Sequence, residues 1–206
     1  MQSGPIETIL VAAAAYLLGS VSFAVVVSRL MGLPDPRSYG SRNPGATNVL
    51  RSGSRLAAAL TLIGDTGKGA IAAGLAVLYT GENPAFGLHA PIAGAMAFLG
   101  HLYPVYHGFK GGKGVATAAG VLLALNVWLG LATLATFGVI LLFFRMVSFA
   151  SIVAAVFAGL YAFYLFGDKP VTPAVAAMAL LLVWRHHANI GRILRGVEPR
   201  LGEKKS

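Results

Sequence analysis

Two apolar segments of this chain are separated by the sequence GFKGGKG, residues 108–114, which holds four glycines and two lysines. Successive backbone N–H groups in a glycine-rich turn can converge on an anion, and a lysine adds a positive charge. The apolar run that starts at Val115 predicts a helix whose N-terminus adds partial positive charge. The nucleotide-binding pattern G-x-x-x-x-G-K-[ST] does not apply, because Gly114 follows Lys113. We therefore interpret the stretch as a phosphate-binding loop; the alternative is a flexible basic turn between membrane helices.

The composition indicates a polytopic membrane protein. Of 206 residues, 56% are hydrophobic and 11% are charged, and the mean hydropathy is +0.73. A soluble domain has about 25% charged residues. There is no cysteine, which excludes disulfides and thiol chemistry. The net charge of +9 would suggest a nucleic-acid partner in a soluble protein, but here it follows from membrane topology, so we expect no nucleic acid.

The fold class that we predict is an all-α membrane helix bundle, since a membrane helix needs about 17–25 apolar residues. The expected spans are residues 6–30, 55–79, 90–106, 115–125, 127–144, 149–166 and 173–184. A long polar loop, residues 31–54, follows the first span. The fourth span is short, and one long kinked helix over residues 115–144 is the alternative to two spans with a turn at Asn126.

The distribution of lysine and arginine decides between seven spans and six. The N-terminus lacks the basic region of a cleaved signal peptide, and the first basic residue is Arg29. With seven spans and the N-terminus outside, 14 of the 16 basic residues lie on the cytoplasmic side, all except Lys68 and Lys169. Six spans would put the basic C-terminal tail outside. We therefore predict about seven spans, a cytoplasmic C-terminus and one membrane domain over residues 1–206.

Two further polar segments fall on the predicted cytoplasmic side. Residues 40–51, GSRNPGATNVLR, offer hydroxyls, amides and two guanidinium groups, which suit a phosphate or a polyol. In the tail, a helix would align His186, Asn189 and Arg192 on one stripe. The alternatives are a solvated turn-rich loop and a basic tail against anionic lipid.

Charged and metal-ligating residue types give two more indications. Asp65 and Lys68 lie three residues apart inside the second span, where charges are paired or functional; a structural pair that closes the bundle is the simpler interpretation. His101 and His107 have the wrong spacing for one helical face, and carboxylates are few. We expect no metal and no cofactor.

Three runs together carry a family resemblance: GSRNPGATNVLR at 40–51, GHLYPVYHGFKGGKGVAT at 100–117 and HHANIGRILRGVE at 186–198. They resemble the signature motifs of the PlsY family, bacterial integral-membrane glycerol-3-phosphate acyltransferases that use acyl phosphate as donor. The motifs occur in order along the whole chain. Two positions depart from the family pattern, which has Gly in place of Arg42 and Arg in place of His187, and both affect local contacts.

The resemblance implies a role for each matching residue. Lys113 and Arg51 would stabilise developing charge, and His186 and Asn189 would complete the catalytic pocket. His186 would orient the glycerol hydroxyl or act as base; an oxygen of the donor phosphate is the alternative base. The substrate-binding residues would be Ser41, Asn43, Gly45, Thr47, Asn48, Gly111, Gly112, Gly114, Arg192 and either Ser148 or Ser151.

The implied reaction transfers an acyl group from acyl phosphate to the sn-1 hydroxyl of glycerol 3-phosphate, giving lysophosphatidic acid and phosphate, the first step of phospholipid biosynthesis. The donor would come from a soluble phosphate acyltransferase, and the site would face the cytoplasm at the bacterial inner membrane, in contact with membrane lipid. The sequence leaves the oligomeric state and the acyl-chain preference open. No histidine is followed five residues later by aspartate, which leaves a charge relay of that pattern unsupported. A secondary transporter for an organic phosphate and a structural lipid-binding subunit are the alternatives from other classes.

Overall fold

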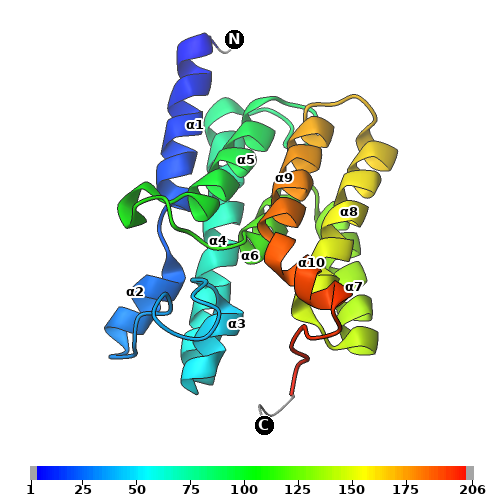
Figure 1. Ribbon diagram of the computed structural model, residues 1–206. Coiled ribbons are helices and arrows are strands. Elements are labelled where there is room, and N and C mark those ends of the chain that lie inside the picture. The colour runs from blue at the N-terminus through cyan, green and yellow to red at the C-terminus, as the bar shows by residue number, and fades with distance from the viewer. Residues whose placement is uncertain (1–3, 203–206) are drawn as a thin grey trace.

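The computed structural model describes residues 4–202, and over that range the chain is all helical, without a β-strand. Figure 1 shows the arrangement. The α-helices are α1 (Pro5–Gly19), α2 (Phe23–Leu30), α3 (Ala46–Val49), α4 (Arg55–Thr80), α5 (His89–Leu102), α6 (Val115–Leu125), α7 (Val127–Phe144), α8 (Val147–Phe166), α9 (Val171–Arg185) and α10 (His187–Leu194), with 3₁₀ turns at Leu50–Ser52 and Val105–His107. The predicted all-α class is confirmed.

Within residues 4–202, three segments are long and apolar enough to cross a membrane: Pro5–Leu30, Val127–Phe144 and Val147–Phe166. Two shorter helices, α6 and α9, are apolar as well. The longest helix, α4, has 26 residues and carries the two buried charges of the second predicted span. The protein is thus built as an integral membrane helix bundle.

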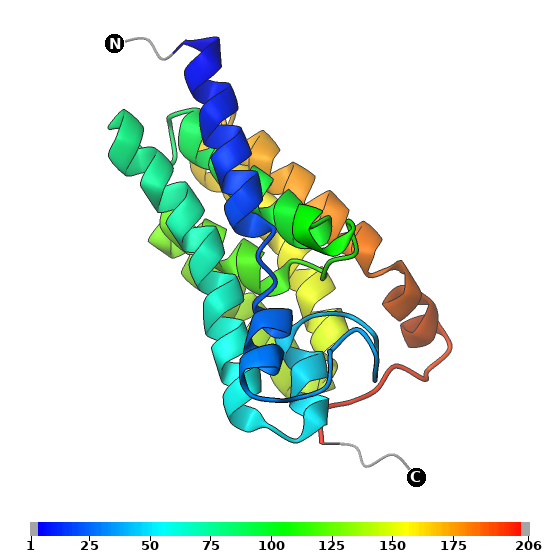
Figure 2. The same cartoon turned by 90° about the vertical axis from the view of Figure 1, so that its left-hand side faces the viewer.

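The first predicted span is two helices and not one, because the chain leaves helical geometry between α1 and α2. Gly19, at the end of α1, contacts the backbone of α5 so closely that an added Cβ would lie 2.1 Å from the carbonyl oxygen of Ala97. After the break, the Val21 carbonyl accepts a hydrogen bond of 2.6 Å from the ammonium group of Lys68 in α4. The break therefore supplies a backbone acceptor to a buried lysine. Figure 2 shows α1 alongside α5 above this break.

The chain turns at Asn126, which separates α6 from α7 as predicted. Asn126 has extended backbone angles, and its side-chain oxygen accepts a hydrogen bond of 3.0 Å from the N–H group of Leu129. This side chain caps the start of α7, so a single kinked helix over residues 115–144 is excluded.

Glycines bring α4 and α6 into backbone contact. A Cβ at Gly120 would lie 1.9 Å from the Thr66 carbonyl oxygen, and one at Gly69 would lie 2.3 Å from the Thr117 carbonyl oxygen. Small residues of this kind let membrane helices approach closely. The contact fixes α6, and therefore the glycine-rich loop that enters it, against the longest helix of the bundle.

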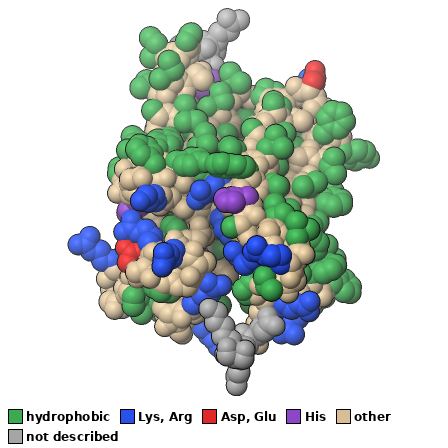
Figure 3. All heavy atoms as spheres, in the orientation of Figure 1, with side chains coloured by type: hydrophobic (Ala, Val, Ile, Leu, Met, Phe, Trp, Pro, Cys, Tyr) green, Lys and Arg blue, Asp and Glu red, His purple; other side chains and the backbone are tan. Residues whose placement is uncertain are grey.

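The helices α1, α5 and α9 all start at one end of the molecule and stop at a similar level within it (Figure 1). They have 15, 14 and 15 residues, so each is only about 22 Å long. The polar loops lie beyond their ends. On the face shown in Figure 3, lysine and arginine side chains gather in the half of the surface that lies beyond these helix ends, whereas the opposite half is mainly hydrophobic.

Candidate active site

Lys113 connects the glycine-rich loop with the polar segment at residues 186–198. Its Nζ atom donates a hydrogen bond of 2.5 Å to the Oδ1 atom of Asn189 in α10. The Nδ2 atom of Asn189 in turn donates to Glu198 Oε1 at 2.6 Å, and Arg192 Nε donates to Glu198 Oε2 at 2.6 Å. Ser148, at the start of α8, donates to the same carboxylate at 2.5 Å. Residues from three separated parts of the sequence thus form one polar network.

The glycine-rich loop binds back onto α5, which corrects the predicted cradle. The N–H groups of Gly111 and Gly112 donate to the carbonyls of Leu102 and His101 at 3.2 and 3.1 Å. Because the last carbonyls of a helix lack intrahelical partners, these two N–H groups satisfy α5 and are not free for an anion. The donors available for an anion begin further along, at Gly114 and the first turn of α6.

Close packing explains the glycines of the loop. An added Cβ at Gly111 would lie 2.1 Å from the His101 carbonyl oxygen. Gly114 has a φ of +83°, and its Cβ would lie 2.2 Å from the ring of Phe98. A glycine is therefore required at these positions by contact and by conformation.

Arg185 holds the opposite side of the loop. Its Nη2 atom donates to the carbonyls of Gly111 and Gly112 at 3.0 and 3.1 Å, and its guanidinium carbon lies 5.7 Å from the ring centre of Tyr103. Since the N–H groups of the same glycines bind α5, the loop is fixed between α5 and the end of α9.

The electrostatics of the site differ for its lysine and its histidine. Burial, together with the charges of Arg192, Arg185 and Arg51, lowers the pKa of Lys113 to about 8, although Glu198 acts in the opposite direction. Burial also lowers the pKa of His186 to about 4, so its imidazole is neutral at pH 7. Its Nδ1 atom lies 2.8 Å from the Leu182 carbonyl and must carry the proton there, which leaves Nε2 as a hydrogen-bond acceptor.

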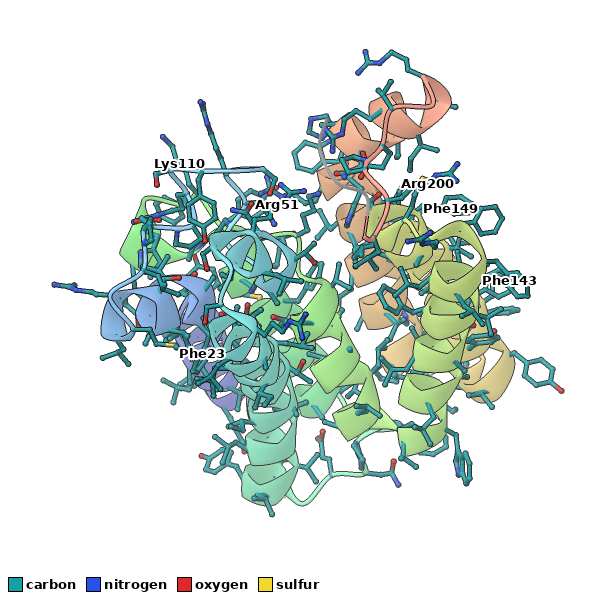
Figure 4. The ribbon with its side chains drawn as sticks, turned by 90° about the horizontal axis from the view of Figure 1, so that it is seen from below. Phe23, Arg51, Lys110, Phe143, Phe149 and Arg200 are labelled. Carbon is teal, nitrogen blue, oxygen red and sulfur yellow. The ribbon has the colours of Figure 1, made fainter. Side chains whose placement is uncertain are left out.

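The segment 40–51 contributes Arg51, while Asn48 is turned inward. The Oδ1 atom of Asn48 accepts from the Ser41 N–H group at 2.9 Å, and its Nδ2 atom donates to the carbonyls of Pro36 and Tyr39. In this structure the amide of Asn48, which was predicted to hold substrate, shapes this loop. Arg51 is exposed and lies near the middle of the view from below, between the two groups of helices, whereas Lys110 lies at the outer edge (Figure 4).

The remaining predicted residues of this segment differ in their exposure to solvent. Ser41 and Thr47 are exposed, and Asn43 and Gly45 are partly buried. The Nη1 atom of Arg51 lies 3.4 Å from Asn48 Oδ1, so the loop that Asn48 shapes also supports the arginine.

The two serines of α8 have different surroundings. Ser148 belongs to the Glu198 network, whereas the Ser151 hydroxyl donates to the Val147 carbonyl at 2.7 Å and lines a partly open apolar cavity of about 60 Å³. The cavity lies between α6, α7, α8 and α9, and its wall includes Val115, which directly follows Gly114. The polar network therefore adjoins an apolar cavity that is partly open.

Two residues of the site were not selected from the sequence. Glu198 collects hydrogen bonds from three side chains, and its pKa is lowered despite burial because Ser148, Asn189 and Arg192 donate to it. Arg185 was assigned to the basic tail. The negative charge of Glu198 could have identified it from the sequence, because it is the only acidic residue between 185 and 202, a stretch with four arginines.

Known proteins are similar to this chain in sequence and in architecture. The family model described as glycerol-3-phosphate acyltransferase matches residues 9–196. A glycerol-3-phosphate acyltransferase of Ralstonia nicotianae is 59% identical, and the alignment covers 97% of each chain. One from Burkholderia pseudomallei is 57% identical over 97% of this chain and 98% of its own.

Two solved structures are similar over almost the whole chain. One is a crystal structure of PlsY, described as an integral membrane glycerol 3-phosphate acyltransferase, in its glycerol 3-phosphate form; the TM-score is 0.88 at 39% identity, covering 95% of this chain and 96% of that one. The lysophosphatidic acid form gives a TM-score of 0.86 at 38% identity, covering 95% of each chain. The fold is that of an integral membrane acyltransferase. The chain belongs to the glycerol-3-phosphate acyltransferase family, the PlsY family.

Proposed function

We propose that this acyltransferase moves an acyl group from acyl phosphate to the sn-1 hydroxyl of glycerol 3-phosphate, giving lysophosphatidic acid and phosphate. The observation that carries the proposal is the contact of Lys113 with Asn189, which brings two polar segments into one basic site. Arg51, Arg185 and Arg192 all lie near enough to lower the pKa of Lys113. Two phosphate-bearing substrates give such an accumulation of positive charge a purpose.

The apolar cavity beside the site supports a lipid-like donor. Val115 and Leu182 belong to its wall, and each lies within four residues of a polar group of the site, Gly114 and His186. An acyl phosphate whose chain enters this cavity keeps its phosphate at Lys113 and the start of α6. The resemblance implies that a soluble phosphate acyltransferase supplies this donor.

The state of His186 favours an orienting role. Nε2 is available as an acceptor for the glycerol hydroxyl, but a pKa of about 4 makes the imidazole a weak base at neutral pH. We therefore assign proton acceptance to an oxygen of the donor phosphate. The mixed anhydride has a good leaving group, so Lys113 and Arg51 act mainly by positioning and charge stabilisation.

The proposed topology has seven spans, the N-terminus outside and the active site facing the cytoplasm of the bacterial inner membrane. The start of α1 and the last described residues, which follow α10, lie at opposite ends of the bundle, which supports an odd number of crossings (Figure 1). The basic residues gather around the site end, which supports a cytoplasmic location for it (Figure 3).

The test uses purified protein in detergent with glycerol 3-phosphate and palmitoyl phosphate, without coenzyme A or acyl carrier protein. We expect phosphate and lysophosphatidic acid in equal amounts. Lys113→Ala should lose at least 100-fold in kcat, whereas Lys110→Ala, an exposed lysine of the same loop, should stay within about threefold. Product from acyl-CoA alone would reject the proposed donor, and full activity in Lys113→Ala would reject the proposed site.

A further inference from the structure

A buried chain of polar contacts runs from the α1–α2 break to the glycine-rich loop. Lys68 Nζ binds the Val21 carbonyl and lies 2.9 Å from Asp65 Oδ1. The same oxygen of Asp65 lies 3.6 Å from Nδ1 of His101 in the last turn of α5. The side chains of Asp65 and His101 are 3% and 7% exposed, so this histidine–carboxylate contact is made away from solvent.

The other edge of the His101 ring meets the loop. A Cβ added to Gly112 would lie 2.1 Å from His101 Nε2, and the three atoms nearest to it all belong to this ring. The backbone N–H group of Gly112 also donates to the His101 carbonyl. His101 therefore contacts the residue directly before Lys113 with both its backbone and its side chain.

We propose that His101, oriented by Asp65, is a positioning residue that sets the place of the Lys113 ammonium group. The imidazole supports Gly112 on one side, and Arg185 binds the carbonyls of Gly111 and Gly112 on the other. Buried ion pairs are weak evidence for stability, because removing the charges from water costs as much as the pairing returns. A role in fixing the geometry of a functional site would explain why these charged and polar side chains are buried together.

This inference rests on the proposed site at Lys113, since the effect passes through that residue. A displacement of about 1 Å at a reacting group can cost on the order of 100-fold in rate. A purely structural His101 predicts a different result: fewer folded molecules, each with unchanged kcat and KM.

His89 provides a matched control on the same helix. It is fully buried at the opposite end of α5, and its Nδ1 atom lies 3.1 Å from a carboxylate oxygen of Glu82. His89→Asn and His101→Asn thus each disturb a buried histidine–carboxylate pair, but only His101 touches the loop. Steady-state kinetics with glycerol 3-phosphate and acyl phosphate, normalised to folded protein, should show kcat/KM lowered 10- to 100-fold in His101→Asn and changed less than threefold in His89→Asn.

Changing the size of residue 112 tests the contact between the loop and the His101 ring. In the wild-type background, Gly112→Ala should lose at least 10-fold in kcat/KM, normalised to folded protein, because the new methyl group meets the imidazole. In the His101→Asn background the space is free, so adding Gly112→Ala should restore at least threefold. A general loss of stability cannot produce this reversal of sign.

Each outcome bears on the proposal. Equal losses in His101→Asn and His89→Asn, or a Gly112→Ala enzyme with wild-type kinetics, would overturn the positioning role. If His101→Asn does not fold, Gly112→Ala alone decides by the same criterion. Lys113→Ala is measured in parallel: if it is fully active, the proposed site itself is wrong, and if it is inactive while His101→Asn keeps wild-type kinetics, only the positioning role fails.

Discussion

The lowered pKa of Lys113 predicts that the enzyme loses activity at mildly alkaline pH. With a pKa of about 8, Lys113 is mostly protonated at pH 7 and mostly neutral at pH 9. If the charged form is the active one, kcat/KM falls about 10-fold between these pH values, because this ratio follows the protonation of the free enzyme. An ordinary lysine, with its pKa near 10.4, would show almost no loss over the same range.

The assay follows phosphate release from acyl phosphate between pH 6.5 and 10, corrected for hydrolysis without enzyme. Lys113→Arg should remove the alkaline limb, because an arginine stays charged throughout this range. Glu198→Gln should move the limb to lower pH, since the Glu198 carboxylate raises the pKa of Lys113. An unchanged limb in both variants would refute the assignment, as would constant kcat/KM up to pH 9.5 in the wild type.

Unfolding does not explain such a loss, because the stability contribution of Lys113 has the opposite sign. Its pKa is lower in the folded protein than the ordinary value of 10.5, so between about pH 8 and 10.5 the unfolded chain binds more protons. Stability from this group therefore rises with pH across that window while activity falls. Thermal unfolding recorded at the same pH values separates the two effects.

Three further changes test the loop, the helix packing and the cavity. Arg185→Met removes the donors to two loop carbonyls and should lower kcat/KM about 10-fold, mainly through KM, in steady-state kinetics with an unchanged melting temperature; an unaltered KM would contradict the fixed loop. Gly120→Val places side-chain atoms against the Thr66 carbonyl and should destabilise the protein by about 1–3 kcal/mol in unfolding experiments in detergent, and a neutral result would contradict the close contact of α4 and α6. Ala158→Phe fills part of the apolar cavity and should shift the preference toward shorter acyl phosphates in competition assays, whereas an unchanged preference would place the acyl chain elsewhere.

Much of the fold could be predicted from local sequence. Asn126 marked the turn between two helices because its side chain can cap a helix start, and it does so. The Asp65–Lys68 pair was predicted because residues three apart share one helix face, and the pair is present. Both features depend on neighbours in the sequence, where helix periodicity is a sufficient guide.

The contacts of the site depended on packing between distant segments. Asp65 and His101 lie on different helices, α4 and α5, so helix periodicity could not predict their contact from the sequence. The N–H groups of Gly111 and Gly112 were expected to bind an anion, but α5 ends beside them and needs their hydrogen bonds. A glycine-rich sequence predicts backbone N–H groups that are free to bind an anion. Only the tertiary structure shows which of these N–H groups already donate to other parts of the protein.

The shortness of three helices explains why a basic site can exist inside this bundle. A hydrocarbon core of about 30 Å is longer than α1, α5 or α9 at about 22 Å each, and the polar loops follow the ends of these helices. There the charge of Lys113 is partly removed from water, which lowers its pKa, while Asn189 and Glu198 supply the polar contacts that the charged form requires. The apolar cavity begins beside the same loop, at Val115. Positive charge and an apolar space thus lie at one level of the bundle, which is the arrangement that the proposed reaction between a water-soluble acceptor and a lipid-like donor requires.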